Sequence, residues 1–134
     1  MKTLLKVLVA YGSLHIGTRV IHRLGALPCV TVAATARGAD EAIAQAAVAR
    51  PALVVVDVIL AQGDGLSVLR ALRRGTTPPA VIMTSSERYP QTRKECLREG
   101  ADFFFTLPDE FDALSRTVSE LAQSVHHAGE GECA

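Results

Sequence analysis

The chain has 134 residues, a length that suits one domain with a hydrophobic core of its own. Its composition, 49% hydrophobic and 21% charged, excludes an intrinsically disordered protein. Fourteen basic residues balance fourteen acidic residues, so no overall charge attracts nucleic acid or an anionic membrane, and we expect neither as a partner.

The first half of the sequence alternates between apolar runs and helical patterns. Residues 4–10 form a short apolar run that predicts a buried strand, and residues 15–27 follow as a helix whose apolar residues recur on one face. Residues 29–35 are rich in β-branched side chains and predict a second strand. The next helix, over residues 40–50, begins with two acidic residues and stops before Pro51.

The second half continues the same alternation. The predicted strands cover residues 53–58, 80–84 and 101–106, and the predicted helices cover residues 66–74, 91–100 and 111–127. The first of these strands has four apolar residues in a row before Asp57, as expected for a strand that is buried on both faces of a sheet. We expect one domain over residues 1–127 and a short flexible tail over residues 128–134.

Five strands that alternate with five helices predict an α/β fold. Strands joined by helical crossovers form a parallel sheet, and right-handed crossovers place helices on both of its faces. The expected arrangement is a flavodoxin-like, doubly wound sheet of five parallel strands in the order 2-1-3-4-5, with five helices. In such a sheet the ligand site lies at the carboxyl ends of the first and third strands, where this sequence has Tyr11-Gly12 and Asp57.

Three segments, LVVVDVILAQGDGLSVLRALRR, AVIMTSSE and EGADFFFTLP, resemble the receiver domain of response regulators, the CheY-like family. The resemblance covers nearly the whole chain. It implies a stand-alone receiver-like module in two-component, or phosphorelay, signal transduction, and not an enzyme. In that family an aspartate at the end of the third strand accepts a phosphoryl group from the histidine of a partner kinase, and Asp57 matches this position.

Several other positions match the receiver pattern. Thr84 matches the hydroxyl residue that senses the phosphoryl group, and Phe104 matches the aromatic switch residue on the fifth strand. Asp64-Gly65 match the turn that opens the third helix. Pro108 matches a proline that usually follows a cis peptide bond, so the resemblance implies a cis bond before Pro108.

The departures from the receiver pattern fall on the groups that neutralise charge. The family usually has two adjacent acidic residues after the first strand, which hold Mg²⁺, and a lysine before the fifth-strand proline. Here these positions are Tyr11, Gly12 and Leu107. Because phosphoryl transfer depends on charge neutralisation and Mg²⁺ prefers carboxylate oxygens, we expect a degenerate receiver, or pseudo-receiver, without a metal or other cofactor. Phosphorylation of Asp57 is expected to be impaired or absent, and the Tyr11 side chain is expected to fill the vacated space and donate a hydrogen bond to Asp57.

Two alternatives remain open. The first is a functional phosphoacceptor with an atypical site, because Asp57, Thr84 and Asp64-Gly65 are all in place. The second is a flavodoxin-like FMN-binding protein, since the segment YGSLHIGTR resembles the phosphate loop of flavodoxins. That loop pattern is matched only in part, and the sequence contains no tryptophan to stack on a flavin ring.

The expected partners are proteins: a histidine kinase, another regulator or a second copy of the chain. A homodimer would use the face formed by the fourth helix, the fifth strand and the fifth helix, which often carries such contacts in receivers. The three cysteines are odd in number and widely spaced, which argues against a disulfide framework or a zinc site and favours a reduced, cytoplasmic setting. No stretch has the length and apolar character of a signal peptide or a membrane span.

Overall fold

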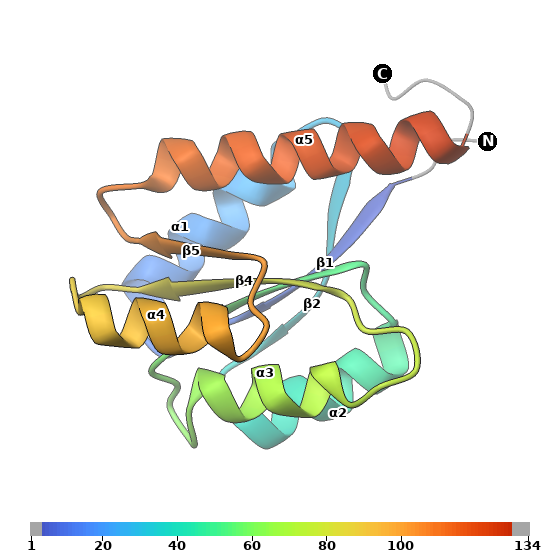
Figure 1. Cartoon of the computed structure of the whole chain (residues 1–134). Helices are drawn as coiled ribbons and strands as arrows, with labels where there is room; N and C mark the ends of the chain where they lie inside the picture. Colours follow the sequence, from blue (N-terminus) through green and yellow to red (C-terminus); the bar gives the residue numbers. More distant parts are fainter. Residues whose placement is uncertain (1–3, 130–134) are drawn as a thin grey trace.

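The structure is a computed structural model that describes residues 4–129. Its strands are β1 (Leu5–Ala10), β2 (Val30–Ala36), β3 (Leu53–Asp57), β4 (Ala80–Ser85) and β5 (Phe103–Thr106). Its helices are α1 (Leu14–Gly25), α2 (Ala39–Ala49), α3 (Gly65–Arg73), α4 (Pro90–Arg98) and α5 (Phe111–Gly129). The strands form one parallel sheet in the order β2-β1-β3-β4-β5 (Figure 1), which confirms the predicted fold class and strand order.

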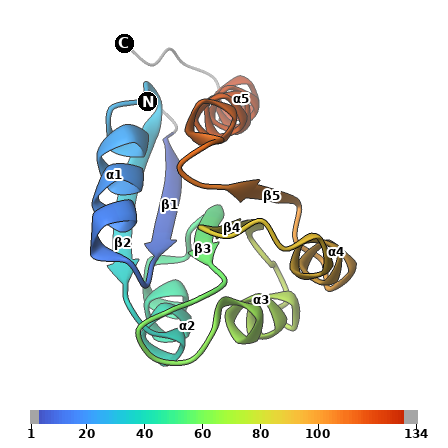
Figure 2. The ribbon, with the colours of Figure 1, turned by 90° about the vertical axis from the view of Figure 1, so that its left-hand side faces the viewer.

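Helices cover both faces of this sheet. α1 and α5 lie on one face, and α2, α3 and α4 lie on the other (Figures 1 and 2). Successive side chains of a strand point to opposite faces, so each strand contributes to two cores. In β1, Leu8 and Ala10 pack in the core under α2, α3 and α4, whereas Val7 and Val9 pack in the core under α1 and α5. Because β1 pairs directly with β3, the carboxyl ends of these two strands lie side by side between the helix layers.

The elements lie within two residues of their predicted bounds, and one of the differences has a physical cause. β5 begins only at Phe103, because the Oδ2 atom of Asp102 accepts the N–H of Val81 at 2.8 Å in place of a backbone partner. α5 continues to Gly129, beyond its predicted end at residue 127. The remainder of the predicted tail, residues 130–134, lies outside the described residues. No helix within residues 4–129 combines the length and hydropathy of a membrane-spanning segment.

Two of the three cysteines lie among the described residues. Cys96 in α4 is free and buried in the core. Cys29, just before β2, is disulfide-bonded, which the odd number and wide spacing of the cysteines did not predict. Spacing along the sequence was a poor guide here, because it does not limit which residues meet in the fold.

Candidate functional site

Asp57 lies at the carboxyl end of β3 and is almost fully buried, with 8% of its surface exposed. Its register neighbour on β4, Thr84, is buried as well. The Oδ1 atom of Asp57 accepts a hydrogen bond from the N–H of Ile59 at 3.0 Å. Burial raises the pKa of Asp57 from 3.8 to about 6, although the hydrogen bond from Ile59 lowers it in part. A buried carboxyl group with a raised pKa at this point of a doubly wound sheet is typical of a functional site.

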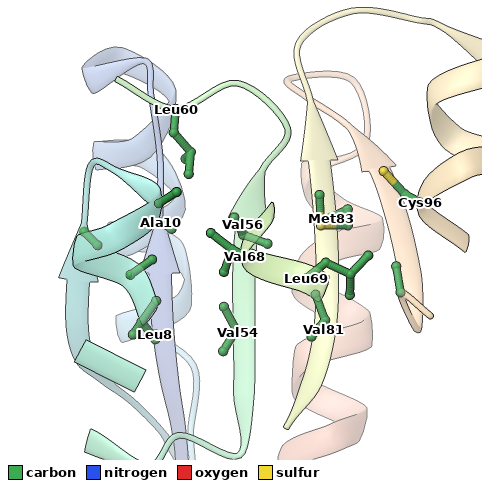
Figure 3. Close-up of a cluster of buried hydrophobic side chains, with 14 of the residues drawn as sticks. Leu8, Ala10, Val54, Val56, Leu60, Val68, Leu69, Val81, Met83 and Cys96 are labelled. Atoms are coloured by element: carbon green, nitrogen blue, oxygen red, sulfur yellow. The ribbon is translucent and has the colours of Figure 1, made fainter. Parts of the chain in front are cut away.

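The β3–α3 loop (residues 58–64) is firmly attached to the ends of the neighbouring strands. Backbone hydrogen bonds of 2.8–2.9 Å run from the N–H of Val58 to the carbonyl of Thr84, from the N–H of Ala61 to the carbonyl of Arg37, and from the N–H of Ala39 to the carbonyl of Gln62. The Leu60 side chain is buried and points toward Ala10 at the end of β1 (Figure 3). The loop is therefore an integral part of the packed structure beside Asp57.

Gly12 touches this loop so closely that no side chain fits. A Cβ atom at residue 12 would lie 2.3 Å from the carbonyl oxygen of Ile59, well inside van der Waals contact. The carbonyl oxygen of Gly12 also accepts a hydrogen bond from Nη2 of Arg37 at 2.9 Å. The loop backbone thus takes the space that the second acidic side chain of a conventional receiver needs.

Tyr11 turns away from Asp57 and packs on α1. A Cβ atom at Gly17 would lie 2.2 Å from the Tyr11 ring, so the ring lies directly on this glycine. The guanidinium carbon of Arg37 lies 5.5 Å from the centre of the same ring. The predicted hydrogen bond from Tyr11 to Asp57 is not formed, because the missing side chain at Gly17 opens a site for the ring on the helix.

Because of the contact between Tyr11 and Gly17, we predict that the effect of Gly17→Ala on stability changes sign when the Tyr11 side chain is removed. Gly17→Ala is expected to destabilise the protein by about 1–3 kcal/mol through overpacking against the ring, although alanine favours helix by about 1 kcal/mol. In a Tyr11→Gly background the ring and the Cβ atom of residue 11, which would lie 2.8 Å from the new methyl group, are both gone, and Gly17→Ala is expected to stabilise the protein by about 0.5–1 kcal/mol. Urea unfolding of the four proteins measures the coupling.

Gly25→Ala is the matched control for this comparison of four proteins, because a Cβ atom at Gly25 meets nothing within 4 Å. Its effect should be the same with and without the Tyr11 ring. Equal effects of Gly17→Ala in both backgrounds would show that the ring does not pack as described.

Leu107 occupies the lysine position of the receiver pattern, but its side chain is part of the hydrophobic core. It is 1% exposed and packs in the cluster under α1 and α5 with Phe111 and Leu114. The N–H of Leu107 donates to the carbonyl of Ser85 at 2.8 Å, and the peptide bond to Pro108 is cis. This position therefore offers no positive charge to a phosphoryl group.

The two switch positions, Thr84 and Phe104, are both buried. The carbonyl of Thr84 is held by the β3–α3 loop, and the residue lies beside Asp57 in the sheet register. Phe104 packs in the core under α2, α3 and α4, and its carbonyl accepts a long hydrogen bond of 3.5 Å from Arg93. The structure thus brings Thr84 to Asp57, whereas Phe104 lies in the hydrophobic core.

The Asp64-Gly65 turn brings α3 close to the end of β3. A Cβ atom at Gly65 would lie 2.2 Å from the carbonyl oxygen of Asp57, so only glycine permits this approach. The Oδ1 atom of Asp64 accepts hydrogen bonds from the N–H and the hydroxyl of Ser67 at 2.8 and 2.9 Å and caps α3. These two bonds lower the pKa of Asp64.

Sequence reasoning missed two residues that shape the site, Arg37 and Ile59. Arg37 ties the end of β2 to Gly12, and Ile59 supplies both the N–H that holds Asp57 and the carbonyl that fills the space at Gly12. Neither is among the individual positions that match or depart from the receiver pattern, although Ile59 lies within a segment that resembles it. The one available signal was their place just after predicted strands, at the edge of the sheet where ligand sites form.

The donors around Asp57 do not fit a magnesium ion. Within residues 4–129 no group of three His, Cys, Asp or Glu side chains is placed to hold a metal. Asp57 offers one carboxylate, of which Oδ1 already accepts the N–H of Ile59, and the position of the second acid is filled by backbone. Mg²⁺ takes oxygen ligands in near-octahedral geometry, which this set does not provide.

Comparison with known sequences points to a single family. The response regulator receiver domain model matches residues 18–119, a range that begins after Tyr11 and Gly12. Protein-glutamate methylesterase/protein-glutamine glutaminase 4 of Myxococcus xanthus is 32% identical over 127 residues, which cover 90% of this chain and 36% of the relative. The sensory transduction protein BceR of Bacillus subtilis is 29% identical over 88 residues, which cover 66% of this chain and 38% of the relative. The chain thus spans little more than a third of the length of these relatives.

Solved structures show the same fold. The signal receiver domain of the putative response regulator NarL from Mycobacterium tuberculosis superimposes with a TM-score of 0.82 at 21% identity, covering 90% of this chain and 98% of that one. The response regulator domain of Thermotoga maritima CheB superimposes with a TM-score of 0.77 at 23% identity, covering 92% of this chain and 97% of that one.

Proposed function

Because the chain belongs to the response regulator receiver domain family, we propose that it is an atypical receiver that signals through protein contacts without magnesium-dependent phosphorylation of Asp57. The observation that supports this most directly is the contact between Gly12 and the carbonyl of Ile59. It fills the position of a metal-binding acid with backbone.

Electrostatic arguments support the same proposal. A metal ion or a positive clamp on a transferring phosphoryl group contributes several kcal/mol to its transition state. This site offers neither the acidic pair nor the lysine, and its remaining carboxylate is buried with a raised pKa. We expect phosphoryl acceptance to be slower than in a conventional receiver by at least about a hundredfold.

Incubation with acetyl phosphate and Mg²⁺, followed by intact-mass analysis, tests the proposal. The chain is expected to gain no phosphoryl group in the time that fully labels a conventional receiver treated in parallel. Asp57→Asn serves as the control for labelling elsewhere. Rapid, magnesium-dependent labelling that Asp57→Asn abolishes would establish the alternative of a functional phosphoacceptor, which the placement of Thr84 beside Asp57 favours.

The flavodoxin-like alternative is not retained. The family match is to receivers, and the hydroxyl of Ser13 accepts the N–H of Ile16 at 3.3 Å as the cap of α1. The Tyr11 ring is packed on Gly17 and is not free to stack on a flavin.

The proposed partner is a histidine kinase or another regulator in the cytoplasm, and we propose no enzymatic activity for this domain. The face formed by α4, β5 and α5 is one candidate surface. It carries an ion pair between Arg88 and Asp109 and an exposed Tyr89 side chain, and both arginine and tyrosine are enriched at interfaces. A homodimer through this face is the competing use of the same surface. The methylesterase relatives are about three times longer than the matched segment, so their activity is not transferred to this chain.

A further inference from the structure

The outward face of α2 carries no charge over two turns. From Ala42 to Ala49 the only polar side chain is that of Gln45. Val48 is 83% exposed, more than any other large hydrophobic side chain in the described part of the protein, and Ala44 and Ala47 are exposed beside it. A helix that is apolar on both faces is normally covered on both faces. The ridge formed by Ala44, Ala47 and Val48 is therefore expected to be covered in the working protein.

A groove lies beside this ridge. A cavity of about 550 Å³ opens between α2, α3 and residues 75–79, at the amino ends of β3 and β4. Most of the lining is small or apolar, including Ile43, Ala46 and Leu72, whereas Arg50, Thr76 and Thr77 contribute polar atoms. α2 and α3 lie next to each other here (Figure 2), and the alanines of α2 leave the space between them open. A ridge and a groove of matching character, side by side on one molecule, suit an isologous interface, in which the ridge of each copy fills the groove of the other.

The charges at the two ends of α2 favour a second copy of the chain as the partner of this surface, with its α2 helix running antiparallel. The first turn carries Asp40 and Glu41, whereas Arg50 stands at the C-terminal cap and the Nζ atom of Lys6 donates to the carbonyl of Ala49 at 2.6 Å. Two such helices packed antiparallel would place the acidic end of each beside the basic end of the other. At 11 residues, or about 16 Å, the helix is short enough for both ends to engage. A parallel pair would instead bring like charges together.

From these observations we infer that α2 forms an interface between two copies of the chain, with the two helices antiparallel about a two-fold axis and each Val48 in the groove between α2 and α3 of the other copy. One helix pair and a short loop make a small interface, so the dissociation constant is expected to be about 1–100 μM. The inference is independent of whether Asp57 is phosphorylated, because the groove opens at the opposite end of the strands.

Sedimentation velocity of the full chain from about 0.5 to about 500 μM tests the inference, since this range brackets the expected dissociation constant of about 1–100 μM. The unmodified protein is expected to sediment as a dimer at the upper concentrations. Val48→Asp is expected to weaken the association by at least about tenfold, because it replaces an apolar side chain by a charge that must lose its water in a groove with a mostly apolar lining. Tyr89→Asp, which changes an exposed apolar residue on the α4 side, is the matched control and should leave the dimer unchanged.

A charge exchange tests the antiparallel direction. Asp40→Lys and Arg50→Asp are each expected to weaken the dimer about tenfold, and the double variant is expected to recover most of the affinity. Both positions are exposed, and aspartate tolerates the left-handed conformation of Arg50, with φ at 49°, so the fold should persist. Circular dichroism checks this for every variant.

Four results would overturn the inference. They are a monomer at all concentrations, a dimer that Val48→Asp leaves intact, a dimer that Tyr89→Asp dissociates, and a double charge variant that fails to recover. The third result would assign the dimer to the face formed by α4, β5 and α5.

Discussion

Gly12→Asp, which restores one acid of the conventional receiver site, is expected to destabilise the protein by about 2–4 kcal/mol and to leave it without measurable affinity for Mg²⁺. The new Cβ atom would lie 2.3 Å from the carbonyl oxygen of Ile59 and 3.1 Å from the Cα atom of Leu60, so the loop backbone has to move. That movement withdraws the buried Leu60 side chain from the core. The introduced carboxylate would also face a carbonyl oxygen, which repels it.

Urea unfolding and magnesium titration by calorimetry measure the two parts of this prediction. Gly12→Ala separates crowding from charge and is expected to show most of the loss of stability. Gly25→Ala, whose Cβ atom meets nothing within 4 Å, is the control for replacing a glycine and should change stability by less than about 1 kcal/mol. A stable Gly12→Asp protein that binds Mg²⁺ would show that the β3–α3 loop is a movable cover and that the site has lost only its ligands.

Asp57→Asn is expected to stabilise the protein at pH 7 by about 2–3 kcal/mol, an effect opposite in sign to most substitutions of buried residues. Burial raises the pKa of Asp57 from 3.8 to about 6, so at pH 7 the folded protein holds an ionised carboxylate that burial disfavours. The difference between the two pKa values corresponds to about 3 kcal/mol. Asparagine keeps an oxygen for the N–H of Ile59 and removes the charge.

The pH dependence of the protein's stability follows from the same raised pKa of Asp57. Between pH 4 and 6 the folded state retains a proton that the unfolded state has released, so the stability of the unmodified protein falls as the pH rises through this window. The advantage of Asp57→Asn should therefore be small at pH 4 and complete above about pH 7. Denaturant unfolding at intervals between pH 4 and pH 8 measures it.

Asp64→Asn is the matched control, because the pKa of Asp64 is shifted in the opposite direction by its hydrogen bonds to Ser67. Its charge contributes stability that is present at neutral pH and is lost as the pH falls through the lowered pKa. Asp64→Asn should therefore weaken the protein at pH 7 and become neutral in acid. A destabilised Asp57→Asn protein at pH 7 would mean that the carboxylate has a favourable partner that outweighs its burial.

Together these expectations describe a receiver in which the carboxylate at the acceptor position, Asp57, is present at a cost in stability. Such a cost is typical of a group kept for function, since replacing it would strengthen the fold. The rebuilt surroundings, with Tyr11 on Gly17 and Gly12 under Ile59, are compatible with a fixed conformation that a partner protein recognises.

Much of the fold followed from local patterns in the sequence. The strict alternation of apolar runs and amphipathic segments predicted the five strands and the five helices, and the one hand of crossover connections predicted helices on both faces of the sheet. The strand order was predicted from the usual arrangement of doubly wound sheets. The position of Asp57 at the end of a fully buried strand was readable for the same reason. Substitution of the acids and the lysine by Tyr11, Gly12 and Leu107 was also visible in the sequence alone.

The tertiary structure decided where these replacements point and what they touch. Tyr11 lies on α1 and not on Asp57, because Gly17, six residues further along the chain, leaves room for its ring. The loop backbone at Ile59 fills the space at Gly12, and Arg37, which follows β2, holds Gly12 in place through a hydrogen bond to its carbonyl. The two contacts of Gly12 join residues that are distant in the sequence, and the geometry of all three contacts depends on how side chains and loop backbone fill one shared volume. Periodicity and motif spacing carry no information about that volume, so the sequence alone determined the scaffold and the lost groups, and only packing determined the shape of the site that remains.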